Sequence, residues 1–231
     1  RPDRIPVSLA QQRMWFLNRF DAESAAYNIP VAIRLSGALD VDALRAAIGD
    51  VVARHEPLRT LYPEDESGPV QKILPAAQAG VDLEVVDVDA SEIASAVGVL
   101  AATSFDVTAQ VPVRVRLYRL SETEYVLGLV VQHISADGGS MGPLTRDVMV
   151  AYGARSAGGV PGWAPLEVQY ADFAIWQREV LGSEDDPRSV AFEQLSFWKQ
   201  ELAGLPDQLE LPTDRPRPAV QSFAGGKIDF S

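Results

Sequence analysis

The chain has 231 residues, no cysteine, two histidines and a formal net charge of −12. Its scattered basic residues argue against nucleic acid as a partner, because phosphate binding depends on clustered Lys and Arg. The lack of cysteine excludes disulfides and thiolate ligands and favours the cytoplasm, and two histidines so far apart argue against a metal site. No apolar run reaches the roughly 18 residues of a membrane helix, so we expect no membrane partner.

Hydrophobic periodicity predicts helices and strands that do not alternate regularly in the first half of the chain. We expect helices over residues 8–17, 40–55 and 91–104, and strands over residues 28–35, 58–62, 70–74 and 81–88. Ser8 is the expected N-cap of the first helix, and Ser91 or Asp89 that of the third. The strands over 58–62 and 70–74 flank an acidic turn, which predicts a hairpin.

In the second half, strands are expected over residues 111–120 and 125–134. The second is almost wholly apolar, so it should be a central strand buried on both faces, with the first as its antiparallel neighbour. Helices are expected over 140–154, 168–181 and 188–202, then an extended segment over 211–218 and a strand from 226. This order favours an α+β sandwich over a doubly wound parallel sheet. Helical spacing also predicts four core aromatic residues, Trp15, Phe16, Phe173 and Trp176.

His133 is the strongest candidate for chemistry. It follows the apolar strand and comes just before a Gly-rich turn. Histidine titrates near neutral pH, which suits it to moving protons. The other histidine, His55, is expected to be solvated or in a local salt bridge. Ser140 is not a candidate nucleophile, because no second histidine is placed to activate it.

Five motifs, in order, resemble those of condensation domains in non-ribosomal peptide synthetases, which have the chloramphenicol-acetyltransferase-like fold. Residues 132–138, QHISADG, resemble the HHxxxDG motif of that family. The other four motifs are SLAQQRMWFL at 8–17, RHEPLRT at 54–60, YADFAIW at 170–176 and PTDRPRP at 212–218. Gln132 stands where the family has the first histidine of its pair, and the two-residue period of a strand directs it away from His133.

The resemblance implies a specific domain organisation. Residues 1–180 would form an α+β, chloramphenicol-acetyltransferase-like lobe, a two-layer sandwich with a mixed, largely antiparallel sheet. Residues 181–231 would hold a connecting helix, the PTDRPRP segment and the start of a second, similar lobe. The family has two lobes, so the rest of the C-terminal lobe would be a missing partner, and the isolated chain would be inactive.

The implied activity is acyl transfer. A donor acyl or peptidyl thioester would be joined to the amine of an acceptor aminoacyl thioester, with His133 as the catalytic residue. Both substrates would arrive on 4′-phosphopantetheine arms of donor and acceptor peptidyl carrier proteins, so no cofactor would be bound directly, and an adenylation domain would lie adjacent. Two alternatives stay open: an epimerisation domain of the same superfamily, and a catalytically weak recruiting or docking module.

Residues near His133 have predicted supporting roles. Asp137 is expected to cap the helix that follows or to pair with an arginine. By resemblance that arginine is Arg54 or Arg59, and Gln132 supports the site from within the strand. A pantetheine arm would pass, and an oxyanion would be stabilised, at the turn formed by Gly138, Gly139 and Ser140.

Overall fold

The computed structural model describes residues 1–216 and 218–219. Its contacts divide the chain into two compact units, Arg1–Val180 and Leu181–Ser231. The described residues that follow Glu201 contain no helix or strand, as expected for the PTDRPRP segment, and the strand predicted from residue 226 lies outside the described residues. None of the helices in the described part of the chain is long and apolar enough to cross a membrane.

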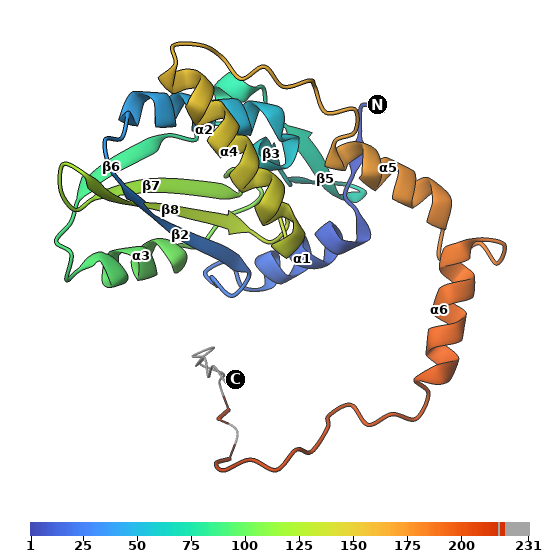
Figure 1. The fold of residues 1–231 in the computed structure, drawn as a ribbon. Coiled ribbons are helices and arrows are strands. Elements are labelled where there is room, and N and C mark those ends of the chain that lie inside the picture. The colour runs from blue at the N-terminus through green and yellow to red at the C-terminus, as the bar shows by residue number, and fades with distance from the viewer. Residues whose placement is uncertain (217, 220–231) are drawn as a thin grey trace. The chain divides into compact units, whose positions relative to one another are not determined.

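A four-stranded sheet lies at the centre of the first unit (Figure 1). Its order is β2 (Asn28–Ser36), β8 (Glu124–Gln132), β7 (Val113–Arg119) and β6 (Leu83–Asp87). β2 and β7 are antiparallel to β8, whereas β6 is parallel to β7. β8 is therefore a central strand buried on both faces, as its apolar sequence predicts. The predicted α+β fold with a mixed, largely antiparallel sheet is confirmed.

Helices pack on both faces of this sheet (Figure 1). On one face, α2 (Val41–Arg54) and α4 (Met141–Ser156) share a core with Leu127 and Val131 of β8. On the other, α1 (Leu9–Phe20) and α3 (Ile93–Ala101) pack against a core that contains Val126 and Val130. Successive side chains of a strand point to opposite faces, so one apolar strand supplies both cores.

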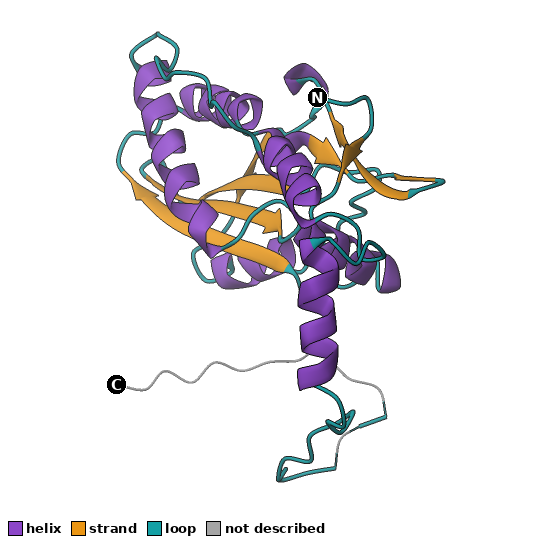
Figure 2. Cartoon of the chain, turned by 90° about the vertical axis from the view of Figure 1, so that its right-hand side faces the viewer, coloured by secondary structure: helices purple, strands orange, loops and turns teal. Residues whose placement is uncertain are grey.

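A second, smaller sheet confirms the predicted hairpin (Figure 2). In it, β5 (Gly68–Ile73) pairs antiparallel with β1 (Ile5–Pro6), β3 (Thr60–Leu61) and β4 (Glu64–Asp65). The strand predicted over 58–62 is shorter than expected, because Glu56–Arg59 forms a 3₁₀ turn with Pro57 at its start. Proline has the fixed φ that a helical first turn requires and lacks the N–H that a strand ladder uses.

The predicted helix caps have mixed outcomes. Ser8 caps α1: its Oγ accepts from the Gln11 N–H at 3.1 Å, and the Gln11 Oε1 accepts from the Ser8 N–H at 3.0 Å. The prediction for the third helix is wrong. α3 begins at Ile93 without a side-chain cap, and Asp89 instead closes the preceding turn by accepting from the Ser91 N–H.

α5 (Tyr170–Leu181) and α6 (Val190–Glu201) lie where the periodicity predicts them. The expectation that all four aromatic residues are in the core is wrong, because Phe16 is 62% exposed and Trp176 57% exposed. Trp15 and Phe173 are half-buried. The buried face of α1 instead carries polar side chains, Gln11 among them.

Candidate active site

His133 lies directly after β8, where the chain leaves the sheet. Its backbone N–H donates to the Tyr27 carbonyl oxygen at 2.9 Å, and its side chain is exposed. Its neighbours Gln132 and Ile134 are each only 4% exposed, so they point into the core while His133 points out of it. Within the described residues no side chain hydrogen-bonds to the imidazole.

A cavity of about 260 Å³ opens beside His133. α1 contributes Arg13 and Met14 to its wall, the turn after β8 contributes Ser140, and the start of α5 contributes Tyr170. Three of the predicted motifs, at 8–17, 132–138 and 170–176, thus meet at one cavity although they are far apart in the sequence.

Asp137 acts as a cap. Its carboxylate accepts from the Ser140 hydroxyl at 2.7 Å and from the Ser140 N–H at 2.9 Å, and it closes the turn that leads into α4. The Ser140 hydroxyl is the main cause of a lowered Asp137 pKa; the Ser140 N–H, the charge of His133 and the Gly139 N–H act in the same direction, and burial opposes them. The amides of Ser140 and Gly139 therefore face Asp137. The oxyanion role expected of residues 138–140 stays a prediction.

The predicted pairing of Asp137 with Arg54 or Arg59 is wrong. Arg54 Nε donates to Asp147 Oδ2 at 2.9 Å, ten residues further along the chain than Asp137. Arg59 donates to the Leu74 carbonyl oxygen, and its Nε is buried without a hydrogen-bond partner within the described residues. The reason is geometric: the C-terminal end of α2 faces the middle of α4 and not the turn that begins it.

Asp147 is a structural residue that the sequence analysis missed. Its side chain is 8% exposed and accepts from Arg54 and, at 2.8 Å, from His55 Nε2. Burial opposes its ionisation, but hydrogen bonds from His55 and Arg54 outweigh burial and lower its pKa. His55 is thus half-buried and paired with Asp147, but this partner lies on another helix and is not local in the sequence. An acidic side chain four positions before the buried Ala151, on the same helix face, was the available signal.

Arg54 also contacts the segment that leads into α5. Its guanidinium lies 4.8 Å from the centre of the Trp163 ring, and its NH1 donates to the Ala164 carbonyl oxygen at 2.6 Å. Gln169 Nε2 donates to the Arg54 carbonyl oxygen at 2.8 Å. In the RHEPLRT motif, residues 54–56 therefore connect α2 to α4 and to the segment before α5. They do not contact His133.

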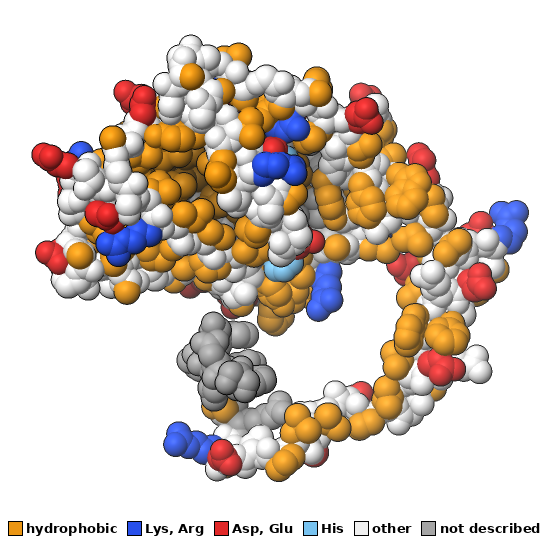
Figure 3. Space-filling model, in the orientation of Figure 1, with side chains coloured by type: hydrophobic (Ala, Val, Ile, Leu, Met, Phe, Trp, Pro, Cys, Tyr) orange, Lys and Arg blue, Asp and Glu red, His pale blue; other side chains and the backbone are white. Residues whose placement is uncertain are grey.

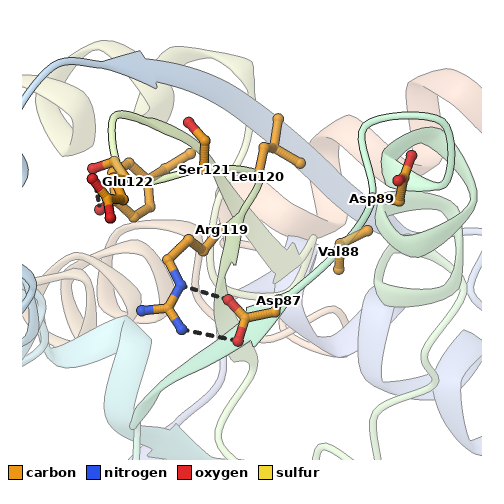
Figure 4. Close-up of a pocket in the computed structure, with 8 residues that line it drawn as sticks. Asp87, Val88, Asp89, Arg119, Leu120, Ser121 and Glu122 are labelled. Atoms are coloured by element: carbon orange, nitrogen blue, oxygen red, sulfur yellow. Dashed lines mark hydrogen bonds and ion pairs between the residues drawn. The ribbon is translucent and has the colours of Figure 1, made fainter.

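Two other hollows lie away from His133. Between α4 and the strands β2 and β8 lies a cavity of about 300 Å³ lined almost wholly by apolar side chains, which gather on this face in Figure 3. A more open, polar hollow lies at the ends of β6 and β7 (Figure 4), where Arg119 and Asp87 satisfy each other, with NH2 to Oδ2 at 2.9 Å. No cluster of three potential metal ligands occurs among the described residues.

The α+β lobe has the chloramphenicol-acetyltransferase-like fold, with a histidine exposed at the end of its central strand. The family model for the condensation domain matches residues 2–231. The chain belongs to the condensation domain family, and the resemblance predicted from its motifs is confirmed.

Similar sequences come from peptide synthetases. Over 230 residues the chain is 52% identical to a protein of Salinispora arenicola described as probable non-canonical nonribosomal peptide synthetase CymA, and the match covers 100% of this chain and 3% of that protein. It is 50% identical over 230 residues to the dimodular nonribosomal peptide synthase of Bacillus subtilis, of which it covers 10%. The chain therefore spans a small part of these multidomain relatives.

Two solved structures have the same fold. The X-domain from teicoplanin biosynthesis is 42% identical with a TM-score of 0.86, over 95% of this chain and 48% of that one. The first condensation domain of the calcium-dependent antibiotic synthetase, in complex with a substrate analogue, is 21% identical with a TM-score of 0.74, over 89% of this chain and 49% of that one. The chain spans about half the length of each.

Proposed function

We propose that this chain is part of an enzyme that forms an amide bond between two thioester-bound substrates. The donor is an acyl or peptidyl thioester, and the acceptor is the amine of an aminoacyl thioester. The observation that carries this proposal is His133, exposed beside a cavity and without a hydrogen-bond partner among the described side chains. A catalytic base must be free to contact the proton that it takes.

The chemistry that we assign to His133 is proton transfer at the acceptor amine. At neutral pH most of such an amine is protonated and unreactive, so a neutral imidazole within hydrogen-bond reach removes a proton or orients the free amine. Starting from the free amine, the nitrogen attacks the thioester carbonyl carbon, and the imidazole takes the proton that this nitrogen loses as the amide forms. The C–S bond breaks, and the imidazolium passes that proton to the departing thiolate. A positioned base typically contributes about 10²–10⁴-fold, so holding the two substrates together supplies much of the remainder.

Carrier proteins would present both substrates on 4′-phosphopantetheine arms. Open space at the turn after His133 supports this proposal: a Cβ added to Gly138 would meet no heavy atom within 4 Å. Gly139 is tighter, since its Cβ would lie 3.4 Å from the Asp137 carboxylate. An adenylation domain and a second lobe complete the partners that we propose, and the cysteine-free composition favours the cytoplasm.

A second candidate is a recruiting module without turnover. It is favoured by the similarity to the X-domain from teicoplanin biosynthesis, which has also been solved as a complex with OxyB. Such a module would keep the fold and bind a partner protein. Gln132, in place of a histidine, is the feature of this chain that keeps this candidate open.

The test is dipeptide formation by the full-length protein with loaded carrier proteins. We expect His133→Ala to lower the rate by about 10²–10⁴-fold, and Gln132→His to leave it within a fewfold of the parent. The parent protein and Gln132→His serve as matched controls for folding. Intact dipeptide formation by His133→Ala would overturn the base role. Absence of product from every variant, with retained binding of a partner, would favour the recruiting module.

A further inference from the structure

Tyr62 is a buried titratable group that lies outside all five motifs. It is fully buried, and its hydroxyl lies between two segments: 3.2 Å from Gln11 Nε2 and 3.1 Å from Ser135 Oγ. Gln11 belongs to α1, whereas Ser135 is two residues after His133. Burial raises the pKa of Tyr62, and the hydrogen bonds with Ser135 and Gln11 oppose this only in part, so the phenol keeps its proton.

The direction of these hydrogen bonds follows from the cap of α1. Gln11 Oε1 accepts from the Ser8 N–H, which fixes the amide and leaves Nε2 as the group that faces Tyr62. An amide nitrogen can only donate, so the Tyr62 oxygen accepts from it. The single phenolic proton is then available to Ser135 Oγ.

Ser135 provides the side-chain anchor of the turn that carries His133. The backbone of the turn is held by the His133 N–H on the Tyr27 carbonyl oxygen and by the Ser135 N–H on the Gln132 carbonyl oxygen at 3.0 Å. Among the described side chains of residues 133–136, Ser135 is the one that forms a hydrogen bond. The Tyr62 hydroxyl therefore fixes the turn to the body of the lobe.

The same network forms one wall of the cavity beside His133. Gln11, Ser135 and Tyr170 line this cavity, and the Tyr170 hydroxyl lies 3.0 Å from Ser8 Oγ. Ser8 is fully buried and Gln11 is 2% exposed, so their side of the network is shielded from water, whereas Ser135 and Tyr170 are half-buried. Networks of this kind hold a unique geometry because each lost partner leaves a buried polar group unsatisfied.

We propose that Tyr62 is a positioning residue for His133 and acts through Ser135. It does not touch substrate; it sets the direction in which the turn presents the imidazole to the cavity. This proposal rests on the catalytic role proposed for His133. It deepens that role by assigning a second residue to the same site.

The chain offers a direct test, because it contains only two histidines. We would record the imidazole NMR signals of His133 and His55 in the parent, in Tyr62→Phe and in Ser135→Ala. We expect both variants to shift or broaden the His133 signals and to leave those of His55 unchanged. In its His133 signals the double variant should match either single variant, because each change alone already removes the contact between Tyr62 and Ser135. Ser135→Thr, which keeps the hydroxyl, should restore the parent spectrum.

Tyr118→Phe is the matched control. Tyr118 is also buried, and its hydroxyl donates to the Ala96 carbonyl oxygen at 2.9 Å, away from the cavity. It should lower stability about as much as Tyr62→Phe without moving the His133 signals. Unchanged His133 signals in both Tyr62→Phe and Ser135→Ala, or equal changes at both histidines and in Tyr118→Phe, would overturn the proposal.

The second readout is turnover by the full-length protein. We expect Tyr62→Phe and Ser135→Ala each to lower kcat about fivefold with KM unchanged, the effect of one lost hydrogen bond expressed in the transition state. A loss of stability without a change in kcat would identify Tyr62 as merely structural. If the parent itself forms no amide, the proposed function fails, while the NMR experiment still decides whether Tyr62 positions His133.

Discussion

The Asp147 carboxylate of α4 lies 2.8 Å from Nε2 of His55, which is 92 positions earlier in the sequence. The two residues join the end of α2 to the middle of α4. Arg54 donates to the same carboxylate oxygen, so the buried Asp147 carboxylate binds the side chains of both Arg54 and His55. A buried charge that loses its partner is costly, and the cluster is therefore a sensitive point of the fold.

The first prediction concerns this cluster. We expect Asp147→Asn to lower the free energy of unfolding by about 3 kcal/mol, because it leaves the Arg54 guanidinium without an anion. Urea unfolding followed by circular dichroism measures the change. Asp87→Asn, which removes an exposed ion pair with Arg119, is the control and should have no measurable effect. Equal effects of the two substitutions would contradict the buried role of Asp147.

The second prediction concerns acid. The hydrogen bond from Arg1 lowers the pKa of Asp172 from its usual value of 3.8 to about 2. A carboxylate whose pKa is lower in the folded state stabilises the fold fully above the unfolded pKa, and this contribution is lost as the pH falls toward the folded pKa. Urea midpoints should therefore fall between pH 4 and about pH 2, and Asp172→Asn should flatten this slope. An unchanged slope in the variant would count against the assignment.

The third prediction concerns Gly128, in the middle of β8. A Cβ there would lie 2.8 Å from Leu100 Cδ2 and 3.2 Å from Tyr118 Cε2, both in buried side chains. Gly128→Ala should destabilise the fold by about 1–3 kcal/mol through overpacking between α3 and the sheet. Gly49 lies in an exposed position of α2, and a Cβ added there would meet no heavy atom within 4 Å. Gly49→Ala should therefore raise the free energy of unfolding by about 0.5–1 kcal/mol. Thermal unfolding of both variants distinguishes these opposite signs.

The fourth prediction concerns the residue before His133. Gln132 Oε1 accepts from the Ile134 N–H, and Ile134 is buried. Gln132→Leu keeps the bulk but leaves this N–H unsatisfied, so we expect a loss of about 1–3 kcal/mol. Gln132→His retains a nitrogen that can accept, and should lose less. If the two variants unfold at the same urea concentration, the hydrogen bond has no measurable role.

The main sheet could be predicted because its signal is local. The apolar run of β8 indicates burial on both faces, and the alternation of apolar and polar residues in β7 indicates burial on one face more than the other. A strand buried on both faces is a central strand. The predicted ends of strands were less accurate where a proline was present. Pro57 turned the start of an expected strand into a 3₁₀ turn.

The site could be predicted only in part, because its partners are chosen by the packing of distant helices. The exposure of His133 follows from its place after the strand, whereas its catalytic role stays a prediction. Asp137 caps the short turn that precedes α4, close to the predicted cap of the helix itself. The choice between Asp137 and Asp147 as the partner of Arg54 depends on where α2 crosses α4. No local pattern encodes that crossing, and nothing in the sequence around Tyr62 marks it as a neighbour of Ser135.

The pairing of β2 has a consequence for the synthesis of the chain. Within the described residues β2 pairs with β8 alone, and Asn28 faces Gln132, which is made roughly 100 residues later. At about 5–20 residues per second, a nascent chain holds this strand without a partner for on the order of 5–20 s. Pro30, which has no N–H to donate, lies within β2 and weakens it as a template for other chains. The order of translation therefore leaves residues 28–36 without their partner for longer than any other strand of the described residues.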